Sequence, residues 1–422
     1  MMPRCCPLWM EVSSSTGICW LRNYRRKGRR RAMTLSVLSD SDRQLVMEVR
    51  ELASTHIAER GAQLDLIGDR EPDWVIPKLL AERNLLAPTI PENYGGRGLS
   101  MMATVAIVEE LAAGCAGAAA IVVANNYALT PILVAGRKHL QDKFLSLVTQ
   151  KEPHLASPVI NDVVSEFDVE GTGPIPEDIT RISTTIRLQG DQVIINGTKD
   201  YILNGAMADF MVLLARNSDS RHKSRLQFVV IPADTPGIHI TEPVLKIGMR
   251  SAHTVRLHYD NVTVPEDYRI GRTGGGYFLL LQTFDRNLAL VGAIGVGIAR
   301  SAYEFVHDLA RRQNILGKNT SDNYHYATAL ADMSAHINAA RLSVYRAAYQ
   351  IDQEGNYSRV STMAKLYATQ VAQQVSSRAV DLVGRMGFLI GHPLEKYLRD
   401  AQMLSMIAGS DYLHRKTVAD QL

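Results

Sequence analysis

The stretch that decides the fold lies near the carboxy-terminal end, where residues 381–415 read DLVGRMGFLIGHPLEKYLRDAQMLSMIAGSDYLHR. It opens with a Gly-x-x-Gly turn at Gly384 and Gly387. From Pro393 onward apolar residues recur at helical spacing, and proline is favoured in the first turn of a helix. The run ends in a corner of small residues, Ala408-Gly409-Ser410. The pattern predicts a turn, a helix over 393–408 and a sharp change of direction after it.

Length and composition indicate a globular protein of two or three domains. The chain has 422 residues, of which 46% are hydrophobic and 21% charged, so sizeable cores can be buried. The net charge of +3 is unevenly spread, because residues 1–32 carry eight Lys/Arg and one acid, which gives +7 there and −4 elsewhere. Outside these first residues, charge does not favour a nucleic-acid partner.

The first 32 residues form a basic leader without helical or strand periodicity, ending in RNYRRKGRRR at 22–31. Three interpretations stay open: an Arg-rich targeting peptide, a polyanion-binding tail, or untranslated sequence upstream of a native start at Met33.

Cysteine use and hydropathy bear on the compartment. Only Cys115 lies outside the leader, which excludes a disulfide framework and predicts a reducing, cytoplasmic location. We expect no membrane span, because long apolar runs are broken by polar residues.

Hydrophobic periodicity divides the chain into helices, strands and helices. Residues 39–134 follow helical spacing from a cap at Asp40 or Asp42, and within them Glu109-Glu110 is interpreted as a wet face or a helix pair rather than a catalytic site. From 158 to 264, β-branched residues alternate in short runs.

Turn signals and helix lengths then predict the two later domains. Asn196-Gly197 and Asn204-Gly205 predict turns between strands of a small β-barrel or sandwich. Four long helical segments follow Gly276, over 277–312, 326–353, 358–383 and 393–408. They predict an antiparallel four-helix bundle. The expected fold is α+β, with an N-terminal helical domain over 33–155, a middle β-barrel over 156–272 and a C-terminal bundle over 273–422.

The order of these domains and several segments together resemble the acyl-CoA dehydrogenase superfamily over residues 39–415. The segments include IPENYGG, IINGTKDYILNG, LADM, MAKLYA and LEKYLRDAQM. The resemblance implies bound FAD, an acyl-CoA or related acyl substrate, an electron-transferring flavoprotein as a candidate acceptor, and a homotetramer.

The catalytic base of that family is missing. Its Arg-Asp-Ala helix leads into a Tyr-Glu-Gly-Thr corner whose glutamate removes the α-proton of the thioester, and that position is Ala408 here. The family's alternative base position, on the first bundle helix, is Asn287. Because removing an α-proton needs a carboxylate held dry and close, the sequence predicts an atypical member.

The resemblance also assigns cofactor and substrate positions, many of them substituted. Ser165 is what survives of the motif that wraps the flavin, the family's Trp-x-Thr becomes Tyr201-Ile202-Leu203, and Ser410 keeps the hydroxyl of the corner's threonine. The positions that hold the neighbouring subunit's adenosine are Gln313, Tyr324, Asp381, Gly384 and Arg385, and the substrate positions are Phe284, Asp285, Arg250 and Gly409.

Several of these side chains have two interpretations. Arg250 either meets a CoA phosphate or forms a surface ion pair. Arg385 either pairs with Asp381 at i, i+4 spacing or contacts a phosphate. Asp285, Asp411 and His253 are the nearest candidates for another base, with structural roles as the alternative.

Other chemistries find less support. The histidines after Asp322 lack metal-ligand spacing, so no metal site is predicted. The glycine-rich TGGGYF at 273–278 lacks the following Lys-Ser/Thr of a phosphate loop and is interpreted as a domain hinge.

Two classes of function follow. One is a flavoenzyme with atypical chemistry on an acyl-CoA, of which base-less relatives such as a sulfinyl-CoA desulfinase or a flavin-dependent N-oxidising enzyme are variants. The other is a non-catalytic subunit that completes the flavin pocket of a competent sister chain in a hetero-oligomer.

Overall fold

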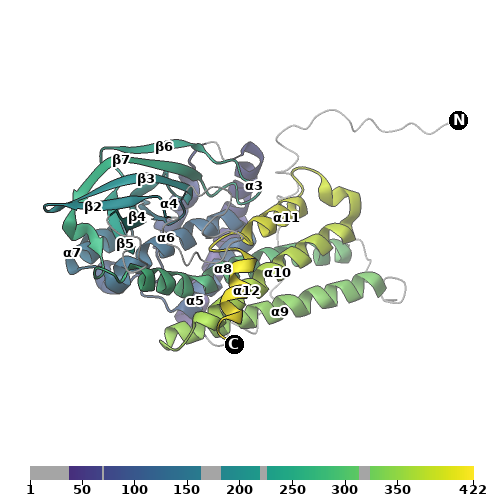
Figure 1. The fold of residues 1–422 in the computed structure, drawn as a ribbon. Coiled ribbons are helices and arrows are strands. Elements are labelled where there is room, and N and C mark those ends of the chain that lie inside the picture. Colours follow the sequence, from purple (N-terminus) through teal and green to yellow (C-terminus); the bar gives the residue numbers. More distant parts are fainter. Residues whose placement is uncertain (1–37, 69–70, 163–181, 219–225, 313–323) are drawn as a thin grey trace.

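The computed structural model describes residues 38–68, 71–162, 182–218, 226–312 and 324–422. Within them, helices precede and follow one β-sheet along the chain, as the α+β prediction required, and Figure 1 shows the sheet on one side of the molecule and the carboxy-terminal helices on the other. The basic leader, Ser165 and Gln313 lie outside the described residues.

Side-chain caps fix the starts of two N-terminal helices. The hydroxyl of Ser39 accepts a hydrogen bond from Asp42 N at 3.1 Å, so the predicted cap at Asp40 or Asp42 is wrong and the residue before them caps the helix. Asp352 accepts hydrogen bonds from the first two amides of α5, including Met101 N at 2.6 Å. The helices are α2 (Asp40–Leu52), the π-helical turn η2 (Ala53–Ile57), α3 (Ala58–Ile67), α4 (Val75–Ala81), α5 (Met101–Gly114), α6 (Ala116–Ala135) and α7 (Lys138–Leu140).

Among the described residues, two helices are long and apolar enough to cross a membrane: α6, and α8, whose bounds are given below. In each, 83% of the apolar window is buried inside the protein, which is the environment of a core helix. The side chain of Asn125 in α6 forms its hydrogen bonds inside the fold. Its Nδ2 donates to Leu86 O, and its Oδ1 accepts from the amide of Ala156.

The described residues in the middle of the chain form one eight-stranded sheet in the order β6-β7-β3-β2-β4-β5-β8, with β1 parallel to β4. Among the described strands, β6 and β8 are the two ends of this path. The strands are β1 (Leu155–Val159), β2 (Thr185–Gln189), β3 (Gln192–Leu203), β4 (Ala208–Asn217), β5 (Leu226–Pro232), β6 (Ile238–Pro243), β7 (Thr254–Pro265) and β8 (Arg269–Ile270).

One of the two predicted turns is wrong. Asn196-Gly197 lies inside β3, where the pairing with β7 shifts register. Gly197 has a φ of 144°, and a Cβ there would lie 2.6 Å from Thr184 Cα. The glycine therefore serves a bulge and a close backbone approach rather than a hairpin. Asn204-Gly205 does form the β3–β4 turn.

The carboxy-terminal helices form the predicted bundle. Small residues let its helices approach closely: a Cβ on Gly292 would lie 2.8 Å from Val344 Cγ2, and one on Gly295 would lie 2.8 Å from Ala368 O. The last long helix ends at Leu404, earlier than predicted. The helices are α8 (Gly276–Arg312), α9 (Tyr324–Asp352), α10 (Ser358–Val383), the 3-10 turn η8 (Gly384–Phe388), α11 (Pro393–Leu404) and α12 (Asp411–Ala419).

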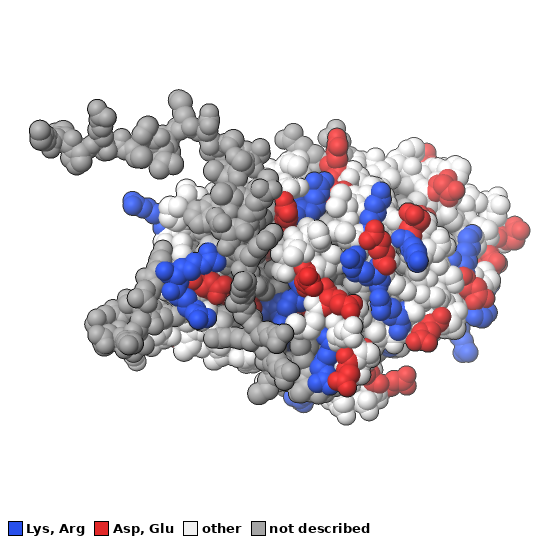
Figure 2. All heavy atoms as spheres, turned by 180° about the vertical axis from the view of Figure 1, so that it is seen from behind, with Lys and Arg blue, Asp and Glu red and all other residues white. Residues whose placement is uncertain are grey.

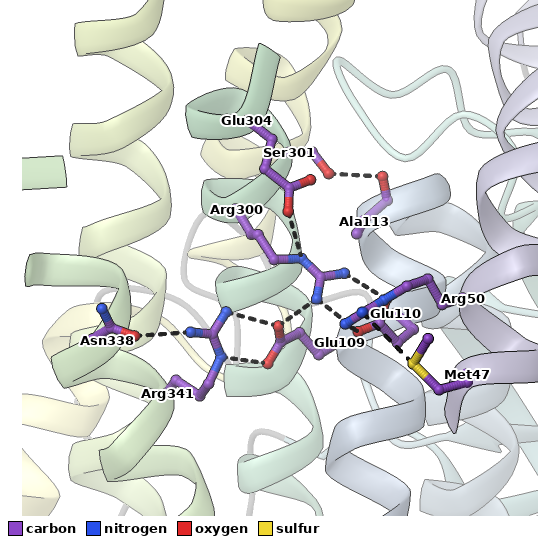
Figure 3. A network of polar contacts seen from close by, with 10 residues as sticks. All are labelled: Met47, Arg50, Glu109, Glu110, Ala113, Arg300, Ser301, Glu304, Asn338 and Arg341. Atoms are coloured by element: carbon purple, nitrogen blue, oxygen red, sulfur yellow. Dashed lines mark hydrogen bonds and ion pairs between the residues drawn. The ribbon is translucent and has the colours of Figure 1, made fainter. Parts of the chain in front are cut away.

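A buried charge cluster joins the N-terminal helices to the bundle (Figure 3). Glu109 and Glu110 on α5 are 5% and 4% exposed, so their interpretation as a wet face is wrong. Arg300 on α8 donates to both carboxylates at 2.7–2.9 Å. Arg341 on α9 binds Glu109 at 2.9 and 3.0 Å, and Arg50 on α2 binds Glu110 at 2.6 and 2.9 Å. Four helices are thereby held at one point.

Charged side chains on the surface are mixed in sign. Figure 2 shows basic and acidic groups interspersed over the described residues of one face. The described residues of this face therefore form no broad basic surface of the kind that nucleic acid requires.

We predict that Glu110→Gln lowers the free energy of unfolding by about 3–5 kcal/mol, because it leaves the buried guanidinium of Arg300 and the partly buried one of Arg50 short of an anion. Urea denaturation of wild type and variant measures this difference in the free energy of unfolding. Glu82→Gln is the control, since Glu82 is 63% exposed in its pair with Arg83 and should cost under about 1 kcal/mol. Equal losses in the two variants would contradict this account of the cluster.

The same cluster sets a pH dependence. Burial opposes ionisation of Glu110, but the charge of Arg300 and hydrogen bonds from Arg50 and Arg300 lower its pKa from 4.5 to about 2. Because the pKa is depressed in the folded state, the stabilisation is complete above about pH 4.5 and is lost as the pH falls towards 2. The difference in the free energy of unfolding between wild type and Glu110→Gln should stay constant from pH 7 to 5 and shrink below pH 4.5. A difference that already shrinks near pH 6 would contradict the lowered pKa of Glu110.

Candidate functional site

The small-residue corner after α11 turns the chain sharply, as predicted. Ala408 has a φ of 55° and Gly409 a φ of 98°, so both lie in the left-handed region that alanine seldom adopts. The hydroxyl of Ser410 accepts from Leu413 N at 3.3 Å and caps α12. The corner is therefore held in a conformation that its surroundings must stabilise.

Lys365 on α10 holds the corner from beneath. Its side chain is fully buried, and Nζ donates to Gly409 O at 2.8 Å and Ser405 O at 3.1 Å. Asp411 Oδ1 lies 3.6 Å from the same nitrogen and accepts from Thr369 Oγ1 at 3.3 Å. These contacts favour the structural role for Asp411 over that of a base.

His414 packs against the corner from α12. Its imidazole is 4% exposed, and Nε2 lies 3.1 Å from where a Cβ on Gly409 would stand. Burial, and next the charge of Lys365, lower the pKa of His414 to about 3, against hydrogen bonds to the backbone of Ala408 and Gly409. The ring is therefore neutral at physiological pH, and Nε2 has no hydrogen-bond partner among the described residues.

The second predicted base position is also without a carboxylate. Asn287 on α8 is 1% exposed, and its amide donates to Thr130 Oγ1 at 2.9 Å and Thr283 O at 2.8 Å. Phe284, one turn earlier, packs edge-on against Tyr127 with ring centroids 5.6 Å apart. Asn287 thus ties α8 to α6.

Asp285 is the one half-buried acid at the predicted substrate positions. Burial raises its pKa, and a hydrogen bond with Ser358 opposes that rise. Ser358 begins α10, seven residues before Lys365, which is about 10 Å along the helix axis. Asp285 therefore lies beside a different part of α10 from the Ala408 corner.

Tyr201 offers a flat ring at the surface of the sheet. It lies at a second bulge of β3 with a φ of 55°, and its side chain is 52% exposed. Asp200, which binds Arg256, accepts from Tyr201 N at 2.9 Å. Leu203 adds no hydroxyl, and its carbonyl accepts from Ser157 at 2.7 Å.

Of the positions predicted to meet a neighbouring adenosine, the four that the structure describes lie at one end of the bundle. Tyr326 near the start of α9 donates to Leu382 O near the end of α10, which brings Tyr324 close to Asp381, Gly384 and Arg385. Asp381 is sixteen residues beyond Lys365 on α10, which is about 24 Å. This group is therefore separate from the Ala408 corner.

Two predicted ion pairs are not formed among the described residues. Arg250 instead donates to Asp65 O at 3.0 Å and Lys246 O at 3.1 Å. Arg385 and Asp381 are both exposed, and the ion pairs of the described residues include none between them. For both arginines, phosphate binding stays a prediction. The third candidate base, His253, is buried against the sheet at 4% exposure.

Sequence reasoning missed Lys365 and His414. Lys365 stands in MAKLYA, a lysine on an otherwise apolar helix face, and that contrast is a usable signal for a buried cation. His414 lies four residues after Ser410 on a short amphipathic helix, where sequence alone gives no sign that it faces the corner.

Comparison with known protein families identifies the family of this chain. The acyl-CoA dehydrogenase N-terminal, middle and C-terminal domain models match residues 39–152, 175–262 and 274–422, in that order. The chain belongs to the acyl-CoA dehydrogenase family. The predicted resemblance and the order of its domains are confirmed.

Relatives match over nearly the whole chain. Cyclohexane-1-carbonyl-CoA dehydrogenase of Geobacter metallireducens is 27% identical over 385 residues, covering 91% of this chain and 98% of the relative. Short-chain specific acyl-CoA dehydrogenase, mitochondrial, of Rattus norvegicus is 28% identical, covering 91% and 90%.

Solved structures agree with the fold. Butyryl-CoA dehydrogenase from Megasphaera elsdenii superposes with a TM-score of 0.83 at 24% identity, covering 91% of this chain and 98% of that one. Glutaryl-coenzyme A dehydrogenase in its glutaryl-CoA complex gives a TM-score of 0.82 at 25% identity, covering 91% and 95%.

We predict that Gly409→Ala destabilises the chain by about 1–3 kcal/mol, because it combines positive φ with a contact on His414. Gly384→Ala is the matched control: Gly384 has a φ of 70°, but a Cβ there meets nothing within 4 Å. Thermal unfolding of both variants separates the effect of backbone strain at positive φ from the effect of the steric contact. A loss as large in Gly384→Ala would show that His414 and Leu413, which both lie 3.1 Å from a Cβ added at Gly409, play no part.

Proposed function

We propose that this chain is an FAD-dependent oxidoreductase of acyl-CoA dehydrogenase type that acts on an acyl-CoA thioester by a reaction needing no carboxylate at position 408. The observation that carries the proposal is the corner itself, where Ala408 lies beside the buried ammonium of Lys365 and the neutral imidazole of His414. The substrate class is supported by the relatives, which are named as dehydrogenases of acyl-CoA compounds.

The described residues fit a flavin at one wall. The half-exposed ring of Tyr201 on its bulge gives a flat surface for an isoalloxazine, and the neighbouring backbone at Leu203 continues that edge. Bound FAD would accept a hydride from the substrate. Structures of similar fold include an FAD-dependent dehydrogenase and an FAD complex of PigA. For the rest of the cofactor we propose Ser165, Gln313, Tyr324, Asp381, Gly384, Arg385 and Ser410.

The chain's own groups limit the chemistry. Lys365 fixes the carbonyl of Gly409 and so sets the position of Ala408 beside it. Asn287 is committed to Thr130 and to its own helix. Because neither position can take an α-proton, the proposal favours reactions that do not begin with its removal. One is loss of the sulfur group from a sulfinyl-CoA. The other is oxidation at nitrogen.

Partners and compartment follow the same proposal. An electron-transferring flavoprotein is the proposed acceptor, the assembly is a homotetramer, and the compartment is cytoplasmic. The one cysteine of the described residues, Cys115, is free and buried, which is consistent with a reducing compartment.

A second candidate is a non-catalytic subunit that pairs with a competent sister chain. It is favoured by an exposed apolar segment after α10, where Phe388, Leu389 and Ile390 are 63%, 53% and 86% exposed. Contiguous exposed apolar residues mark interaction surfaces, and this segment adjoins the positions proposed to meet a neighbour's adenosine.

Purification of the chain alone distinguishes the two candidates. The first predicts that the chain purified alone is yellow, because it binds flavin without a partner chain. The second predicts a colourless protein that carries flavin only when produced together with a sister chain. Flavin absorbance per chain measures the outcome, and a colourless chain in isolation would reject the enzyme proposal.

We further predict that Ala408→Glu produces anaerobic bleaching with a straight-chain acyl-CoA at least tenfold faster than wild type, because a positioned base contributes about 10²–10⁴-fold to proton transfer. Because Ala408 already carries a Cβ at its positive φ of 55°, a glutamate there introduces no new Cβ contact with the backbone. Ala408→Gln is the control, with the same shape and no basic group. Equal rates in the two variants would refute the assignment of position 408.

A further inference from the structure

A hollow of about 610 Å³ lies where the end of α6 meets the hinge between β8 and α8. Two segments far apart in the sequence build it, one at the end of α6 and one running from β8 towards α8. It shares no lining residue with the Ala408 corner. Its lining residues are Ala135, Gly136, Arg137, Arg269, Gly271, Arg272 and Thr273.

The wall of this hollow is positively charged. Three of its seven lining residues are arginines and none is acidic. Arg269 pairs through Nη2 with Glu266 Oε1 at 3.0 Å, and that glutamate is 40% exposed. Arg137 and Arg272 are exposed, and the ion pairs of the described residues include neither of them. Two guanidinium groups in the wall are thus available to a ligand.

Arg269 supplies a second, independent sign of a missing anion. Its side chain is 13% exposed, and its Nε is buried without a hydrogen-bond partner among the described residues. A buried donor is costly unless an acceptor meets it. An anion in the hollow would provide that acceptor and would draw the guanidinium away from the half-exposed Glu266.

The backbone holds the two basic loops face to face. Gly271 has a φ of 78°, and its N–H donates to Ala135 O at 3.1 Å, which ties the hinge to the end of α6. A Cβ on Gly136 would lie 2.4 Å from Ile132 O, so the turn at the end of α6 requires glycine there. The hydroxyl of Thr273 completes the polar wall.

We propose that this hollow binds a small phosphate-bearing anion, a diphosphate or a phosphate ester. Guanidinium groups match phosphate oxygens in paired hydrogen bonds, and the volume is in the range of small-molecule sites. The interpretation of TGGGYF as a hinge is thereby extended: the segment carries no lysine, and arginines from two loops supply the positive charge instead. This inference does not depend on the proposed oxidoreductase activity.

Isothermal titration of the full chain, with whatever flavin it carries, tests the site with diphosphate, ADP and adenosine. Diphosphate and ADP should bind, adenosine should not, and flavin absorbance should stay unchanged. Arg272→Gln, at an exposed position, should weaken diphosphate binding about tenfold or more, and the Arg137→Gln/Arg272→Gln double variant should weaken it further. Thermal unfolding confirms that the variants remain folded.

Arg346→Gln is the matched control. Arg346 is an exposed arginine in a separate hollow of about 280 Å³ between α9 and α10, so its loss should leave diphosphate affinity unchanged. The proposal is overturned if diphosphate does not bind, if the Arg346 variant weakens binding as much as the Arg272 variant, or if diphosphate displaces flavin, which would place the anion in the cofactor site.

Discussion

The rest of the structure depends on the buried contact between two adjacent glutamates of α5 and arginines from three other helices (Figure 3). Each carboxylate is met by two guanidinium groups, which is what makes buried ionic groups tolerable. The cluster fixes α8 and α9 against α5 and α2. α8 in turn packs on α10 through glycines, and α10 carries Lys365 beneath the corner. The position of Ala408 is therefore set by a chain of contacts that begins at these charges.

Much of the fold could be predicted from the sequence because its long helices have clear apolar periodicity. The predicted bounds of the third bundle helix, 358–383, are those of α10, and the first differs by one residue from α8. Errors arose where distant contacts decide the local structure. Asn196-Gly197 reads as a hairpin turn, but Thr184 from another segment makes the glycine a bulge residue. Glu109-Glu110 reads as a polar face because its three arginine partners are distant in sequence.

The site could be predicted in outline only. The two missing carboxylates, at Ala408 and Asn287, follow from matching ordered segments to a family, and the corner's sharp turn follows from its small residues. Periodicity cannot reveal that Lys365 reaches back to the carbonyl of Gly409 or that His414 packs under it, because these contacts join helices across the bundle. The same contacts explain how an alanine is kept at positive φ, since the carbonyl after it is held by a buried ammonium.

The central claim is that an acyl-CoA dehydrogenase fold here surrounds a site without a proton acceptor at either expected position. Its most direct test is hydrogen exchange at C2 of a saturated acyl-CoA, followed by proton NMR with the flavin-loaded protein in D₂O. The account predicts exchange no faster than in protein-free buffer, because positions 408 and 287 carry no carboxylate, His414 has a low pKa, and Asp411 is held by Lys365 and Thr369. Rapid loss of the C2 signal would show that another base reaches the thioester and would contradict the account.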